Sequence, residues 1–385
     1  MTIDIVLLQY NTACRDNYII LVKLRVMKRK FKVLSLFSSA GVAEFGFDQD
    51  RFDIVLANEL LKYRADTHIA WHPNTEMICG DITDDKIKSE IINESKRKKV
   101  DFILSTPPCQ GVSLIGKNKN NIQMLKDKRN YLIFHTFDII DEIKPKIVLI
   151  ENVARFFKIK YPINNSYVSV EEIIRNKYSN DYVIYCDIFD AANYGVPQHR
   201  ERAIIRMFNK KYSWDNPKKC KKIITVKDAI GDLPSLESGE TSNIKNHYAR
   251  KHSKDNILWM KHTPSGKSAT ENKKYYPKRK NGDRINCYSA SYKRMEWDKP
   301  APTITMRNDC IASQSNVHPG RKLKDGTYSD ARVLTPRELF ILSSINPDID
   351  IPECVSDIQL RHIIGEAVPP KLISSILNGL YEVKK

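Results

Sequence analysis

The first half of the chain alternates short apolar segments with segments of helical spacing, and this alternation limits the available folds more than any other feature. Seven segments crowd apolar residues in the way that is typical of buried strands: 31–37, 52–57, 76–79, 100–104, 146–150, 182–188 and 202–207. Helical spacing marks 62–71, 128–143 and 168–178, and Thr83 to Asp85 predict the start of a further helix. Strands that alternate with helices predict an α/β fold, a mostly parallel sheet with helices on both faces.

An acidic or reactive side chain directly follows four of these predicted strands. The residues are Glu59, Asp81, Cys109 and Glu151. In open α/β sheets, ligands bind in the crevice beyond the carboxyl ends of the strands. We therefore expect these four side chains to share one crevice.

Cys109 is the candidate nucleophile. It follows Pro107 and Pro108, which fix φ and stiffen the turn. A thiol held there is placed like a nucleophile, but needs activation because the thiolate is the reactive form. An inert small residue in a Pro-Pro turn is the alternative. Glu151 could hydrogen-bond a ring nitrogen of a base. Burial would raise the pKa of its carboxyl group, which suits proton donation near neutral pH. Alternatively, Glu151 caps the next helix.

The turn after the first strand suggests a nucleoside cofactor. Phe37 offers a flat face for an adenine, and the small residues that follow it let a ligand approach the backbone. Glu59 could accept hydrogen bonds from both ribose hydroxyls, and Asp81 from an exocyclic amine. Because the G-x-G-x-x-G pattern is absent, NAD and FAD are disfavoured. Each residue alone is also compatible with a turn or helix cap.

Arg200 and Arg202 stand two positions apart, so in a strand they would share a face. They could hold a polar base edge or a phosphate, or pair with acids on the surface.

The net charge of +17 and the pI near 9.3 indicate a polyanion as partner. Residues 208–329 are irregular and basic, and 261–280 hold seven Lys or Arg, one acid and two tyrosines. This mixture suits phosphate contacts and base stacking, with a solvated loop as the alternative.

The eight cysteines are scattered, without Cys-x-x-Cys or a Cys/His cluster. We therefore expect no disulfide framework, no metal site and a reducing, cytoplasmic compartment. No apolar run is long enough to span a bilayer. Residues 1–26 are expected to be an appendage, with Met27 as an alternative natural start.

Six motifs occur in an order that matches one family. They are Phe37-Ser38-Ser39-Ala40-Gly41, Pro108-Cys109-Gln110, Glu151-Asn152-Val153, Gln198-His199-Arg200-Glu201-Arg202, Arg337-Glu338-Leu339 and Gly365-Glu366-Ala367-Val368-Pro369-Pro370. With them the chain resembles the DNA (cytosine-5)-methyltransferases of the bacterial restriction–modification type (EC 2.1.1.37), over about residues 32–380. The chain departs from the family pattern at Ser39 and Val42, where glycine is frequent, and at Glu366, where asparagine is. It also departs at 342–347, where the family has Leu-Gln-Gly-Phe-Pro.

The resemblance implies S-adenosylmethionine as cofactor, the Rossmann-like methyltransferase sheet, and a flipped cytosine in duplex DNA as substrate. It implies a catalytic domain at 27–207, a target-recognition domain at 208–325 and a helical return at 326–385. The implied catalytic residues are Cys109, Glu151, Arg202 and Arg200. The implied cofactor contacts are Phe37, Gly41, Glu59, Asp81, Ile82, Pro108, Leu132 and Val368. The expected DNA contacts are Gln110, Ser113, Gln198, Lys273, Lys274 and Arg279, and residues 111–121 resemble the family's loop that closes over DNA.

By the same resemblance the protein is a monomer, and a cognate restriction endonuclease is its functional partner. Two alternatives stay open at this point. One is an RNA cytosine-5 methyltransferase of the same fold, which the long basic insert disfavours. The other is a non-catalytic DNA-binding protein that keeps the fold, which the intact Cys/Glu/Arg set disfavours.

Overall fold

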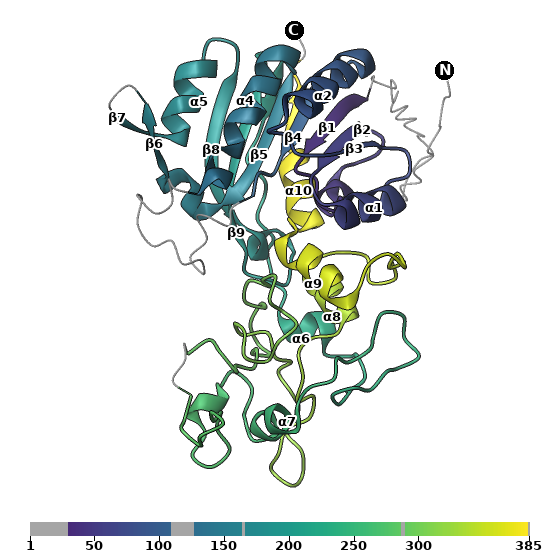
Figure 1. Ribbon diagram of the computed structural model, residues 1–385, viewed down its shortest axis with the longest axis vertical. Coiled ribbons are helices and arrows are strands. Elements are labelled where there is room, and N and C mark those ends of the chain that lie inside the picture. Colours follow the sequence, from purple (N-terminus) through teal and green to yellow (C-terminus); the bar gives the residue numbers. More distant parts are fainter. Residues whose placement is uncertain (1–29, 109–126, 164–165, 286–288, 384–385) are drawn as a thin grey trace, which may run out of the picture.

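The fold is built on one seven-stranded sheet (Figure 1). The computed structural model describes residues 30–108, 127–163, 166–285 and 289–383. The strands run in the order β3-β2-β1-β4-β5-β9-β8. Their bounds are β1 Phe31–Leu36, β2 Phe52–Glu59, β3 Glu76–Cys79, β4 Phe102–Ser105, β5 Ile147–Val153, β8 Val183–Asp190 and β9 Glu201–Phe208.

The strand directions confirm the predicted, mostly parallel α/β sheet. Strands β1 to β5 are parallel to one another, whereas β9 is antiparallel to both β5 and β8. The chain begins at the centre with β1, moves outward to β2 and β3, and then crosses back to β4 beside β1. This reversal opens a crevice beyond the carboxyl ends of β1 and β4, where ligands bind in such folds.

Helices cover both faces of the sheet because side chains alternate along each strand. Leu34 and Leu36 pack in the core under one layer of helices, and Val33 packs in the core on the opposite face. The first layer is α2 Asp85–Lys98, α4 Leu132–Ile143 and α5 Val170–Tyr178. The opposite face is covered by α10 Pro370–Leu377 with the 3-10 turns η1 Ala43–Gly46 and η4 Ala191–Tyr194.

Five further elements belong to this domain. Helix α1 spans Lys62–Trp71 and contacts β3 at the sheet edge. The 3-10 turn η2 Lys128–Tyr131 leads into α4, and η3 Ala154–Lys158 follows β5. Strands β6 Lys160–Ile163 and β7 Ser166–Ser169 form a small antiparallel pair before α5.

The implied helical return at 326–385 ends in a short strand. Helix α10 ends at Leu377, and β11 Leu380–Glu382 then pairs with β10 Tyr212–Trp214. Gly379 permits the turn, since an added Cβ there would lie 2.2 Å from the Asp215 carbonyl oxygen. The Trp214 indole donates to the Ile376 carbonyl at 2.7 Å. Residues 212–214 therefore pack with the sheet domain.

A layer of helices connects the basic insert to the sheet domain (Figure 1). Helices α6 Val226–Ile230, α8 Pro336–Leu342 and α9 Asp357–Glu366 share one apolar cluster with Ala40 and Val42. Further out, α7 Lys254–Lys261 and the 3-10 turn η5 Ala269–Glu271 surround a smaller core that contains Met260 and Val317. The insert thus has a core of its own, although most of it is irregular, as predicted.

A buried arginine joins the insert to α8. Arg332 is fully buried, and its five N–H groups donate to Leu236 and Val333 carbonyls and to the Asp330 and Glu338 carboxylates, at 2.7–3.1 Å. Burial raises the pKa of Glu338, but Arg332 and His318 outweigh it and lower that pKa to about 2. Glu338 therefore stays charged at neutral pH and pairs with Arg332.

No helix in the described part of the chain has the length and apolar character needed to cross a membrane.

Candidate active site

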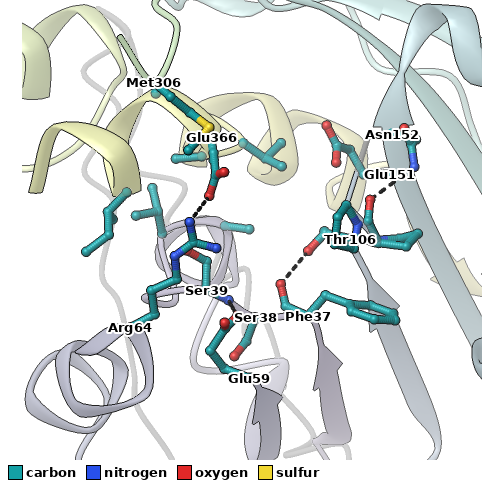
Figure 2. Close-up of a pocket in the computed structure, with 18 of the residues that line it drawn as sticks. Phe37, Ser38, Ser39, Glu59, Arg64, Thr106, Glu151, Asn152, Met306 and Glu366 are labelled. Atoms are coloured by element: carbon teal, nitrogen blue, oxygen red, sulfur yellow. Dashed lines mark hydrogen bonds and ion pairs between the residues drawn. The ribbon is translucent and has the colours of Figure 1, made fainter. Parts of the chain in front are cut away.

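A cleft of about 650 Å³ lies at the point where the strand order reverses (Figure 2). Its walls come from the ends of β1 to β5, from residues 303–307 of the insert and from 363–368 at the end of α9. This volume is in the range of small-molecule sites. The predicted shared crevice is confirmed for Glu59, Asp81 and Glu151, which all line it.

The turn after β1 is held in an unusual backbone conformation. Phe37 and Ser39 have φ values of 57° and 49°, a left-handed region that is costly for residues other than glycine. The Ser38 amide donates to the Asn58 carbonyl at 3.0 Å, and the Thr106 hydroxyl donates to the Phe37 carbonyl at 3.0 Å. These bonds tie the turn to β2 and β4, so that it lines the cleft as a fixed wall.

Glu59 is fixed at the end of β2 by backbone donors. Its two carboxylate oxygens accept from the Ser39 and Leu61 amides, each at 2.9 Å. Burial raises the pKa of Glu59, and these amides with Arg64 offset only part of that rise. The carboxylate has further lone pairs that can accept hydrogen bonds from a ligand.

Glu151 and Arg202 form the opposite end of the cleft. The Arg202 Nε lies 2.7 Å from Glu151 Oε1, and both side chains are about nine-tenths buried. Burial raises the pKa of Glu151 more than Arg202 and Arg200 lower it, so its pKa stays above the usual range. The neighbouring Asn152 amide donates to the Pro107 carbonyl at 3.1 Å. This bond holds the Pro-Pro turn against β5.

Arg200 lines the cleft but is held mainly by protein carbonyls. Its guanidinium donates to Ile304 at 2.8 Å and to Gly365 at 3.0 Å. It therefore connects the strand end to the insert and to the end of α9. This geometry suits a supporting role beside Arg202.

The predicted cofactor residues, with one exception, line the cleft. They are Phe37, Glu59, Asp81, Ile82, Pro108, Leu132 and Val368. Gly41 is not among the residues that line the cleft, and its contact with the cofactor stays a prediction. It has φ 76°, and an added Cβ would lie 2.4 Å from His72 Cδ2, so glycine is needed there for packing against α1.

Gln198, a predicted DNA contact, makes its hydrogen bonds to the protein, and its contact with DNA stays a prediction. Gln198 is buried, and its amide donates to the Leu342 carbonyl while its oxygen accepts from the Ile304 amide at 3.1 Å. Its side chain is thus used to join β9 to the insert and to α8. The predicted residues Cys109, Gln110 and Ser113 lie outside the described residues; Cys109 directly follows Pro108, which lines the cleft.

Lys273, Lys274 and Arg279 lie exposed on the insert. The aromatic rings beside them are ordered by stacking: His262 and Tyr275 have centroids 3.9 Å apart, and the Lys274 ammonium lies 5.2 Å from the Tyr275 ring. Within the described residues, no group of His, Cys, Asp and Glu is arranged to hold a metal ion.

Sequence reasoning missed Arg64 as a cleft residue. Arg64 projects from α1 and pairs with Glu366 across the cleft wall at 2.6 Å. In the sequence Arg64 is one charged residue on a predicted helix, and no local pattern assigns it a partner 302 positions away. Met306 also lines the cleft and was missed, because no local sequence pattern marks it.

Comparison with known proteins agrees with this geometry. Residues 31–382 match the family described as C-5 cytosine-specific DNA methylase. The type II methyltransferase M1.HgaI of Avibacterium volantium is 47% identical over 92% of this chain and 99% of its own length. The type II methyltransferase M1.HphI of Haemophilus parahaemolyticus is 30% identical over 91% of this chain and 86% of its own. Among solved structures, the Entamoeba histolytica methyltransferase EhMeth superposes with a TM-score of 0.62 at 15% identity, covering 91% of this chain and 98% of that one.

The sheet, its switch-point cleft and the structural neighbours define an S-adenosylmethionine-dependent methyltransferase fold. Within that class, the chain belongs to the C-5 cytosine-specific DNA methylase family, as the sequence motifs predicted.

Proposed function

We propose that the protein is a type II methyltransferase (EC 2.1.1.37) that methylates carbon 5 of a flipped cytosine within a specific duplex DNA sequence. One observation carries the proposal: the Glu151–Arg202 pair and the fixed Glu59 carboxylate line the same cleft, with Pro108, the neighbour of Cys109, between them in the strand order. The 47% identity to M1.HgaI supports the type II assignment and a role in protecting DNA from a cognate endonuclease. The monomeric state and the endonuclease stay predictions.

The hydrogen-bond acceptors and the apolar side chains of the cleft suit S-adenosylmethionine. Glu59 offers acceptors for two ribose hydroxyls, and Asp81 offers an acceptor for the adenine amine. Apolar side chains on either side would hold the adenine ring and exclude water, namely Phe37, Ile82, Leu132 and Val368. When bound, the cofactor supplies an electrophilic methyl group on a sulfonium sulfur.

The protein's own groups would make carbon 5 nucleophilic. The Cys109 thiolate forms a bond to carbon 6 of the flipped cytosine, and Glu151 hydrogen-bonds N3 and favours its protonation. Electron density would then build at carbon 5, which makes this carbon the nucleophile toward the methyl group that the cofactor would supply. A base removes the carbon-5 proton, and the bond between carbon 6 and Cys109 breaks to restore the ring. Arg202 would hold the exocyclic oxygen, with Arg200 supporting it.

A duplex carrying 5-fluorocytosine at the target tests this mechanism. Because fluorine cannot leave as a proton does, the enzyme is expected to stay bonded to the base in a denaturation-resistant adduct that requires the cofactor. Cys109→Ser is expected to form no adduct, whereas Cys220→Ser, at an exposed free cysteine, should trap like the unchanged protein. Adduct formation by the Cys109 variant would remove Cys109 from the mechanism, and absence of any adduct at a mapped site would refute covalent catalysis.

We also propose that Lys273, Lys274 and Arg279 contact DNA phosphates. Their exposure and the ordered Tyr275 ring beside them support this role. Each phosphate contact releases condensed counterions, so Lys273→Gln with Lys274→Gln is expected to lower the slope of log affinity against log salt by about two. The matched control is Lys96→Gln with Lys88→Gln on α2, which should leave the slope unchanged. An equal slope in both double variants would contradict the assignment.

A further inference from the structure

A cluster of buried polar side chains lies behind the turn that follows β1. Glu44 of η1 and His68 of α1 are 3% and 0% exposed, and Glu44 Oε1 lies 3.6 Å from His68 Nε2. The Ser35 hydroxyl donates to the same carboxylate oxygen at 2.5 Å. At the C-terminal end of α1, the His72 ring packs against the His68 ring with centroids 4.8 Å apart. None of these four described residues is among those that line the cleft, and the proposed chemistry makes no use of them.

Packing alone does not account for the polar character of this cluster. Burial raises the pKa of Glu44, but His68, His72 and Ser35 outweigh it and lower that pKa, so the carboxylate stays charged at neutral pH. Its second oxygen and both ring nitrogens of His68 have no hydrogen-bond partner among the described residues. Buried polar groups without a full set of partners cost free energy, and apolar side chains of similar size would avoid that cost. The cluster therefore fits a role beyond stability.

His72 connects this cluster to the turn. Its Nε2 atom lies 2.8 Å from the Gly41 carbonyl oxygen. Because a carbonyl oxygen can only accept, Nε2 carries a proton and donates this hydrogen bond. Burial and His68 lower the pKa of His72 more than Glu44 and the Gly41 carbonyl raise it, so the ring is mainly neutral at pH 7. The bond fixes the last residue of the turn from the side away from the cleft.

The turn transmits this support to Glu59. The Gly41 amide donates to the Ser38 carbonyl at 2.9 Å and closes the turn. Phe37 and Ser39 are held inside it with positive φ values, which persist only where the surroundings fix them. In that conformation the Ser39 amide donates to Glu59 Oε2 at 2.9 Å (Figure 2). A turn released at Gly41 would let this amide move, and the Glu59 carboxylate with it.

We propose that His72 is a positioning residue for the cofactor: through the turn after β1 it fixes Glu59 for the ribose hydroxyls. The inference rests on the proposed function and adds to it a residue that does not line the cleft. The charge of Glu44 and the packing of His68 hold the His72 ring in place. The strength of a hydrogen bond depends on distance and angle, so a small shift of Glu59 weakens its contact with a hydroxyl. Loss of the His72 bond should therefore affect the ribose contact and spare the adenine contacts.

Calorimetric titration with S-adenosylhomocysteine and with its 2′-deoxy analogue tests the inference without measuring methylation. The two compounds differ by one ribose hydroxyl, so the ratio of their dissociation constants reports the contact with Glu59. The unchanged protein is expected to prefer S-adenosylhomocysteine at least about tenfold, since the analogue lacks a hydrogen bond to a charged group. His72→Phe keeps an aromatic ring without a donor, and should reduce this preference to about twofold. Its affinity for the 2′-deoxy analogue should stay within about twofold of that of the unchanged protein.

Two further variants separate the hydrogen bond from the packing of the ring, and they give an answer even if His72→Phe does not fold. The amide nitrogen of glutamine can take about the position of Nε2, so His72→Gln should keep most of the preference. Asparagine is one methylene shorter, so His72→Asn should lose it. The matched control is His247→Phe in the insert, since His247 is buried and its Nε2 also lies 3.1 Å from a carbonyl oxygen, that of Pro234. This control should lower stability and leave the preference unchanged.

The outcomes separate this inference from the proposed function. If the unchanged protein binds neither compound, the proposed cofactor is wrong and the inference falls with it. If it binds both compounds equally, the ribose contact of Glu59 and the inference are refuted, whereas the cofactor stands. If a clear preference in the unchanged protein persists in His72→Phe, or is equal in His72→Gln and His72→Asn, then His72 only packs against the turn and the inference is overturned.

Discussion

Glu151→Gln is expected to lower the rate of methyl transfer by about a thousandfold, because proton donation by a positioned acid contributes about 10² to 10⁴. The substitution keeps the shape of the side chain and its place at the end of β5, but the amide cannot give up a proton as a carboxyl group does. Burial holds the pKa of Glu151 above its usual range in spite of Arg202, which suits donation near neutral pH. Single-turnover methylation of the mapped duplex with labelled cofactor measures the effect.

Cofactor binding by the Glu151 variant should stay within about twofold, since Glu59 and the turn after β1 are untouched. The matched control is Asp101→Asn. Asp101 is a buried carboxylate paired with Lys146 at 2.8 Å. It directly precedes β4 and therefore lies at the amino ends of the parallel strands, opposite the ends that form the cleft. Its variant should methylate at the normal rate. Equal loss in both variants would mean that the effect reports stability and that Glu151 has no special part in the chemistry.

Arg332→Leu is expected to destabilise the protein by about 3–5 kcal/mol, the usual cost of removing one partner from a buried ion pair. The leucine would leave the Glu338 carboxylate, now held by both Arg332 nitrogens, buried without its cation. Two backbone carbonyls, those of Leu236 and Val333, would also lose a donor. Urea unfolding at pH 7 measures the change.

The destabilisation should shrink as the pH falls. Arg332 holds the folded pKa of Glu338 at about 2, below its usual 4.5, so the pair stabilises the fold above about pH 4.5 and loses that contribution towards pH 2. Arg332→Lys keeps the charge but not the five-donor geometry, and should lie between the leucine variant and the unchanged protein. Lys245→Met, at an exposed pair with Asp350, should cost less than about 1 kcal/mol. An equally small cost for Arg332→Leu would contradict the role given to this arginine.

Local patterns were sufficient for most of the sheet domain. The predicted helix 62–71 and strand 76–79 have the bounds found in the structure, because apolar spacing and the Gly80 turn mark them locally. The end of α10 could not be predicted in this way. The residues after it continue an apolar pattern, and the turn at Gly379 is set by the approach of Asp215, 164 positions earlier.

The site residues that could be predicted are those that directly follow a strand. Glu59, Asp81 and Glu151 each follow a strand, so the topology alone brings them together. Gln198 also belongs to a motif, yet its partners Ile304 and Leu342 lie more than 100 positions away, and its burial could not be read from its neighbours. The sequence pattern therefore located the cleft, whereas long-range contacts decide which polar residues face it.

The bonds that Gln198 and Arg200 make to Ile304 bear on how this enzyme could be re-engineered. Residues 303–307 come from the end of the insert, but they line the cleft and are held by the strand end. A chimera in which these residues came from another protein together with the rest of the insert would lose part of the cleft wall. Functional chimeras should therefore keep this stretch with the recipient scaffold and place the C-terminal splice point before Ala301, whose carbonyl accepts from the His199 amide.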